Sequence, residues 1–175
     1  MTVVKLFEIF WAMLPSLLSS PLQSPCIRYD MVAEEVSLEE DVEVLAKGPY
    51  FSVNALTRIK LCRGAVPMSA TALAAALLHE LGHFDQLVQQ NFLANTPQKA
   101  IVAEAYADEF MFAHLGENGL DCGDVSAFLD AYRAGETKGE ALARELMVNA
   151  FGRWADPHGG DDSRVAACKA ALGPD

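Results

Sequence analysis

The order of hydrophobic and polar residues predicts a few short strands followed by a longer series of helices. The runs Cys26–Val32, Tyr50–Val53 and Thr57–Leu61 are short and rich in β-branched and aromatic residues, so we expect each to form a strand. Only Asn54-Ala-Leu separates the second run from the third, which predicts a hairpin or bend between them.

The pattern then changes to helical spacing. Residues 69–78 are almost all apolar and good helix formers, which predicts a buried helix with Ser69 or Thr71 as its N-cap. Thr96-Pro97 is typical of a helix start, and the second helix is expected to cover residues 98–115 and to stop at the following glycine.

Three more helices are predicted toward the C-terminus. Asp124 is expected to cap a helix that ends near Arg133, and Thr137-x-x-Glu140 is a capping box for a helix that ends near residue 151. A last helix is expected over residues 162–172. The sequence therefore predicts an α+β fold, mainly helical, with a small sheet before the 69–78 helix.

The first 18 residues are strongly apolar and need a separate interpretation. Their large side chains recur at near-helical spacing, so we expect a short amphipathic helix packed on the domain. The alternative is a signal peptide or an interfacial membrane anchor. Glu8 and the prolines at positions 15, 21 and 25 disfavour that alternative and a membrane span. Membrane association through this segment is therefore not the favoured prediction. We divide the chain into residues 1–25, the N-terminal apolar segment, and residues 26–175, the main domain.

The chemistry of the chain is concentrated in His79-Glu80-x-x-His83, which follows the apolar run. Two histidines four residues apart lie on one helix face, about 5–6 Å apart at Cβ, so both imidazoles can bind one metal ion. Glu80 lies beside that metal, where it can take a proton from a metal-bound water. The alternative is a core helix that carries two histidines by coincidence, but buried histidines beside a glutamate are costly without partners.

The second long helix offers a third ligand. Glu104 follows His83 by 21 residues, which leaves room for a loop and an antiparallel return. Asp108 lies one turn later on the same face and can accept the N–H of a ligand histidine. Their neighbours are mostly apolar, and a buried carboxylate pair needs a cation. The sequence therefore predicts a zinc site of His79, His83 and Glu104 with Asp108 behind it. The alternative for Glu104 is a solvated helix carboxylate.

These residues resemble the motifs of the gluzincin metallopeptidases, in which two histidines and a downstream glutamate bind zinc and the motif glutamate is the general base. His79-Glu80-Leu-Gly-His83 with Glu104-Ala-x-Ala-Asp108-x-Phe is most similar to the Ste24/HtpX-like peptidases and the soluble minigluzincins. The resemblance implies a zincin-like single domain. It also implies a zinc-dependent endopeptidase that acts on peptide or protein substrates.

A segment near the C-terminus resembles the closing motif of the same group, in which His-Pro precedes an arginine and an aliphatic residue. His158 and Arg164 keep the spacing of that motif, but Gly159 replaces the proline. The resemblance implies that His158 or Arg164 stabilises the oxyanion of the tetrahedral intermediate. Alternatively, His158 is a loop residue and Arg164 pairs with a carboxylate.

Two other functions stay open. One is a metal-binding regulator of the ImmA/IrrE-like type, which binds a partner protein with little turnover and has a related helix with asparagine in place of Asp108. The other is a latent protease whose own terminal segment blocks the cleft. Tyr106 and His114 are further candidates for the oxyanion role, although they lie off the Glu104 face of the helix.

Charge and cysteine content narrow the partners and the compartment. The net charge of −11 argues against nucleic acid as a partner, and the acidic residues between positions 34 and 43 are expected to form a solvated segment.

No CxxC pair is present, so a structural zinc finger is not expected. The four cysteines permit two disulfides, but buried free thiols in a reducing compartment are the expectation. This predicts a cytoplasmic protein, with a secreted or membrane-peripheral location as the alternative. The cysteines are Cys26, Cys62, Cys122 and Cys168.

Overall fold

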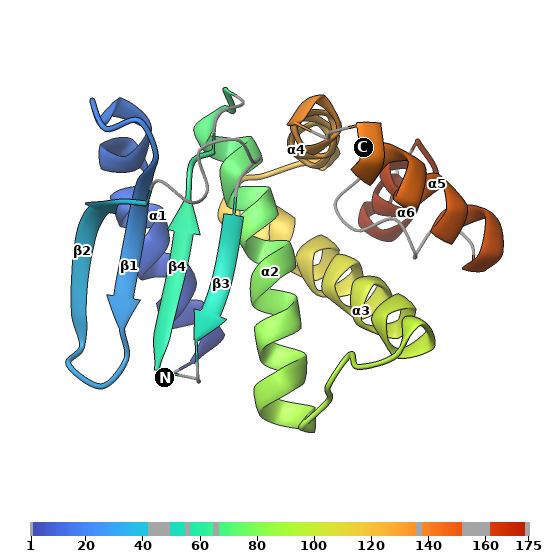
Figure 1. The fold of residues 1–175 in the computed structure, drawn as a ribbon, viewed down its shortest axis with the longest axis horizontal. Coiled ribbons are helices and arrows are strands. Elements are labelled where there is room, and N and C mark those ends of the chain that lie inside the picture. The colour runs from blue at the N-terminus through green and yellow to red at the C-terminus, as the bar shows by residue number, and fades with distance from the viewer. Residues whose placement is uncertain are drawn as a thin grey trace.

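The computed structural model describes residues 2–41, 50–54, 57–64, 67–135, 138–151 and 162–173. Within them the chain is α+β, with a small antiparallel sheet before the motif helix and helices in most of the remainder (Figure 1). This confirms the predicted fold class. The strands are β1 (Pro25–Asp30), β2 (Glu35–Glu40), β3 (Tyr50–Asn54) and β4 (Arg58–Cys62). The helices are α1 (Val3–Ser19), α2 (Ala70–Gln90), α3 (Pro97–Leu115), the short 3₁₀ helix η2 (Gly116–Asn118), α4 (Cys122–Gly135), α5 (Lys138–Phe151) and α6 (Asp162–Leu172).

The sheet has the strand order β2-β1-β4-β3, and all neighbouring strands are antiparallel. β3 and β4 form the expected hairpin. Residues 35–40 of the acidic segment form strand β2, which pairs with β1 and which the sequence did not predict. Its side chains are exposed or half-buried, but its backbone completes the sheet. A glutamate-rich strand is tolerated at a sheet edge, where charge discourages pairing with another chain.

Helix α1 is the amphipathic helix that the sequence predicts, and it runs along the sheet in Figure 1. Its buried side chains are Leu6, Phe7, Phe10, Leu14 and Leu17. They belong to the same hydrophobic core as α2 and one face of the sheet. Arg63, just after β4, donates to the backbone carbonyls of Leu18, Ser20 and Leu22 and so fixes the end of α1. Within the described ranges, no helix is long and apolar enough to cross a membrane.

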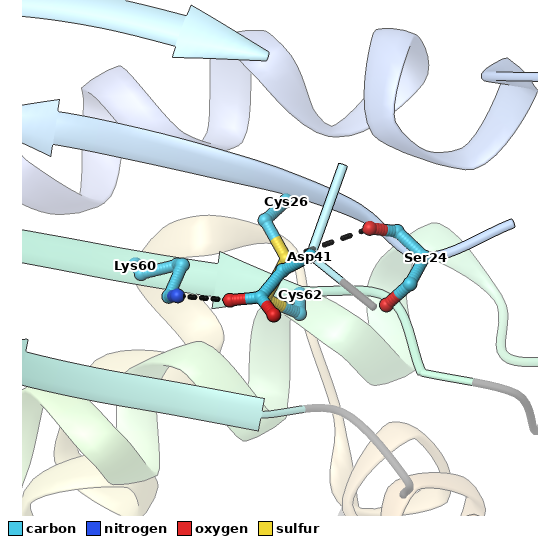
Figure 2. Close-up of a disulfide and its surroundings, with 5 residues drawn as sticks. All are labelled: Ser24, Cys26, Asp41, Lys60 and Cys62. Atoms are coloured by element: carbon cyan, nitrogen blue, oxygen red, sulfur yellow. Dashed lines mark hydrogen bonds and ion pairs between the residues drawn. A yellow bond between two sulfur atoms is a disulfide. The ribbon is translucent and has the colours of Figure 1, made fainter. Parts of the chain in front are cut away.

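The sheet face opposite this core carries a disulfide between Cys26 of β1 and Cys62 of β4, which are directly opposite in the strand register. Figure 2 shows Asp41 beside it. The N–H of Asp41 donates to the Ser24 carbonyl at 2.9 Å, and its carboxylate pairs with Lys60. These contacts attach Asp41, the residue after β2, to Ser24 and to Lys60 of the inner strand β4.

A second disulfide joins Cys122, at the start of α4, to Cys168 in α6. The expectation of free thiols was therefore wrong, because all four cysteines are paired. The partners lie 36 and 46 residues apart in sequence, and only the folded arrangement of strands and helices brings them together.

The start of α4 also differs from the prediction. Asp121 is the capping residue, because its carboxylate accepts the N–H groups of Gly123 and Asp124. The carboxylate of Asp124 in turn accepts the N–H of Asp121, which makes the cap reciprocal. Thr137, the expected cap of the next helix, lies outside the described residues.

Candidate metal centre

Helix α2 carries the motif because its sequence favours a long buried helix. The Ser69 hydroxyl accepts the N–H of Ala72 at 3.1 Å and caps the first turn. Of the ten residues from Ala72 to Leu81, all except Glu80 are buried. His79 is fully buried, and His83, one turn later, has a side chain that is 26% exposed. His79 therefore lies in the core, and His83 lies near the surface.

Helix α3 returns alongside α2 at close range. Thr96 caps its first turn, with Pro97 as the first helical residue, as predicted. Gly82 is a point of close approach, because a Cβ atom built there would lie only 2.8 Å from the Cα of Ala107. This close packing places Glu104 of α3 opposite the histidines of α2.

The structure brings together the three metal ligands that the sequence predicts. One ligand atom from each of His79, His83 and Glu104 lies within 4.8 Å of the others. One carboxylate oxygen of Glu104 lies 3.3 Å from Nε2 of His79, and the other lies 3.4 Å from Nε2 of His83. The imidazole rings are perpendicular, with centroids 4.8 Å apart. Two nitrogens and a carboxylate oxygen that converge in this way can hold a metal ion.

The other ring nitrogen of His79 faces Asp108. Its Nδ1 lies 2.8 Å from Oδ1 of Asp108, which directs Nε2 toward the ligand cluster. Arg164 of α6 holds the same carboxylate from the other side, with Nε donating to Oδ2 at 2.7 Å and a terminal nitrogen donating to Oδ1 at 2.6 Å. Asp108 is therefore fixed between a histidine and an arginine.

The buried charges shift the pKa values of this group. Burial lowers the pKa of His79, but the hydrogen bond to Asp108 and the nearby carboxylate of Glu104 outweigh burial and raise it from 6.5 to about 10. Burial raises the pKa of Asp108, but its hydrogen bonds to His79 and Arg164 outweigh burial and hold it below 3.8. In the metal-free protein, His79 is thus a proton-binding group between two carboxylates.

The other candidates from the sequence have separate partners. The Tyr106 hydroxyl donates to Asp85 at 2.7 Å and connects α3 to α2 away from the ligand atoms. That hydrogen bond is also the main reason that the pKa of Tyr106 is raised. His114 pairs with Glu117 at the end of α3. His158 lies outside the described residues, so its suggested role stays a prediction.

Tyr132 of α4 has a pKa that responds to the charges of Glu80 and Glu104, which the sequence did not reveal. Burial, then the charges of Glu80 and Glu104, raise its pKa well above 10, so the tyrosine lies close enough to both carboxylates to sense them. Its ring packs edge-on against Phe128, whose ring lies 6.2 Å from that of His79. The four-residue spacing of the two aromatic residues puts them on one helix face. Nothing in the sequence indicates that this face packs against α2.

Comparisons of the chain with protein-family models, with curated proteins and with solved structures find no match. The class of site is therefore defined by its geometry: a partly buried His/His/Glu group, consistent with a zincin-like centre, in a mainly helical α+β fold.

Proposed function

We propose that this protein is a zinc-dependent endopeptidase of the gluzincin type. His79, His83 and Glu104 hold the metal, and Glu80 is the general base. The observation that carries this proposal is the convergence of the three predicted ligands within 4.8 Å, with Asp108 on the remaining nitrogen of His79.

The donor set supports zinc as the metal. Two imidazoles and one carboxylate are the ligands of a known class of catalytic zinc site, which keeps its fourth position open. The partial exposure of His83 and Glu104, 26% and 13%, leaves the ligand group accessible from one side. Substrate approaches from that side.

Each residue of the site has a separate role in the proposed hydrolysis. When bound, zinc acts as a Lewis acid that brings the pKa of a coordinated water toward neutrality. Glu80 accepts a proton from the attacking water and delivers it to the leaving amine. Asp108 keeps His79 in the orientation that presents Nε2. Tyr132 lies near Glu80 and Glu104 and joins His158 as a candidate for contact with the substrate.

The two disulfides bear on the compartment. Disulfides persist in oxidising environments and are rare in the cytosol. Two of them in 175 residues support the secreted alternative over the cytoplasmic location that the sequence suggests.

The test combines metal analysis with peptide hydrolysis. We expect one zinc per chain in the wild type and a sharp loss of zinc in Glu104→Ala. Glu109→Ala is the matched control, because Glu109 is exposed on the same helix. Glu80→Gln should retain zinc but lose hydrolysis of a peptide library by about 10²–10⁴-fold, the usual contribution of a general base.

Each other outcome has a definite meaning. A wild type that takes up no zinc after reconstitution would exclude the metallopeptidase. Zinc binding without hydrolysis of any peptide would favour the metal-binding regulator. Full hydrolysis by Glu80→Gln would show that another group is the base.

A further inference from the structure

Among the described residues, Arg164 and Asp108 are the most deeply buried charged side chains outside the ligand group. Arg164 is 1% exposed, and Asp108, which it contacts, is 0% exposed. The guanidinium and the carboxylate form two short hydrogen bonds of 2.7 and 2.6 Å. An arginine fork matched to a carboxylate in this way fixes the plane of the carboxylate as well as its charge.

The same carboxylate orients His79. Oδ1 of Asp108 accepts from Arg164 and also lies 2.8 Å from Nδ1 of His79. A change in the plane of the carboxylate would therefore rotate or release the imidazole. Because Arg164 has almost no exposed surface, it has little to offer a substrate directly.

The helix that carries Arg164 also carries a covalent link. Cys168 lies one helical turn after Arg164 on α6 and is bonded to Cys122 at the start of α4. Helix α4 packs on α2, the helix that carries His79, and its Phe128 ring lies 6.2 Å from the His79 ring. The disulfide therefore ties α6 to an element that itself rests on the site.

We infer that Arg164 is a positioning residue for the metal ligand His79, acting through Asp108, and that the Cys122–Cys168 disulfide holds Arg164 at that position. The inference rests on the proposed function for the identity of the metal. Its effect on His79 is a property of the metal-free protein as well.

The first measurement needs no metal. In protein labelled with ¹⁵N-histidine, the Nδ1 proton of His79 is expected to be protected from solvent exchange, since it is buried and bonded to Asp108. Arg164→Met should speed that exchange at least tenfold, and Arg164→Lys, which keeps the charge but loses the fork, should give an intermediate value. A purely structural arginine would lower the melting temperature without changing this proton in the folded protein.

The second measurement is zinc affinity by chelator competition. Loss of a residue behind a metal ligand weakens affinity by about 10–100-fold, and we expect this for Arg164→Met. The double variant Cys122→Ser/Cys168→Ser should show both effects, the faster exchange of the His79 proton and the weaker zinc affinity. Cys26→Ser/Cys62→Ser removes the other disulfide, on the sheet face away from the core, and should show neither effect.

The outcomes separate this inference from the proposed function. A folded Arg164→Met with wild-type exchange and zinc affinity would overturn the inference. If Arg164→Met does not fold, the same wild-type values in Arg164→Lys would overturn it. If the wild type binds no zinc, the proposed function fails, but the exchange of the His79 proton in the metal-free protein still decides the role of Arg164.

Discussion

At the residue scale, the site depends on the two nitrogens of His79. Nε2 faces Glu104 and Nδ1 faces Asp108, so the ring lies between two carboxylates in a fully buried position. A buried imidazole in this position binds a cation on one side, either a proton or a metal ion.

Under the proposed function, zinc and a proton compete for His79. Its pKa of about 10 in the metal-free protein means that the ring is protonated at neutral pH. The apparent zinc affinity should rise by about tenfold per pH unit between pH 7 and 9, because binding displaces one proton. Chelator competition at each pH measures this slope. Asp108→Asn should flatten it, because the main group that raises the pKa is gone.

The same shift affects the stability of the metal-free protein. The folded pKa of His79 lies above its ordinary value of 6.5, so its contribution is fully present below pH 6.5 and is lost as the pH rises toward 10. Urea unfolding across this range should show the loss in the metal-free form.

A zinc affinity that does not change between pH 7 and 9 would show that His79 is already neutral in the metal-free protein.

The sequence predicted that these residues lie together because their placement depends on local spacing. His79, His83, Glu104 and Asp108 lie on two consecutive helices, where helical periodicity alone puts each pair on one face. Tyr132 was missed, since its place near Glu80 depends on how α4 packs and not on any local pattern.

At the element scale, the distance between α2 and α3 is set by Gly82. The missing side chain lets the Cα of Ala107 approach to within contact of the α2 backbone, and Phe110 lies next to the same point. This separation decides whether Glu104 reaches both histidines. The sequence predicted both helices but not their distance, which depends on side chains that meet only in the folded state.

Gly82→Ala should therefore separate the two helices. A Cβ at this position would lie 2.8 Å from backbone, which cannot move aside as a flexible side chain would. We expect a loss of about 1–3 kcal/mol in the free energy of unfolding, typical of overpacking, together with weaker zinc binding.

Gly116→Ala is the control for this variant. Gly116 ends α3 with an ordinary helical φ of −61°, and no atom lies within 4 Å of an added Cβ. Its stability should equal or slightly exceed that of the wild type. If Gly82→Ala is as stable as the control and binds zinc equally well, the close approach does not set the geometry of the site.

At the scale of the whole molecule, the two disulfides stabilise two separate parts of the fold. One joins neighbouring strands of the sheet, and the other joins α4 to α6. The sequence permitted disulfides but did not predict them, because cysteine spacing does not reveal which segments become neighbours. Strand β2 was also missed, because a run of glutamates is typical of a solvated segment. Its place in the sheet comes from the pairing of its backbone with β1.

The sheet disulfide should contribute to stability without affecting the metal. It closes a segment of 36 residues, and removing such a link costs about 2–4 kcal/mol. Urea unfolding of Cys26→Ser/Cys62→Ser should show this loss, while zinc affinity stays at the wild-type value. Unchanged stability would mean that the antiparallel pairing of β1 with β4 holds the sheet without the link.

The position of Arg164 in the chain also has a consequence for the order of folding. The ligand helices α2 and α3 are joined by a short loop, so their pairing closes a small loop and can form early. Arg164 meets Asp108 across 56 positions, and that contact waits until α6 has docked. A nascent chain thus gathers its three candidate metal ligands first and gains a fixed His79 last. Under the proposed function, tight metal binding is therefore reached only when the fold is complete.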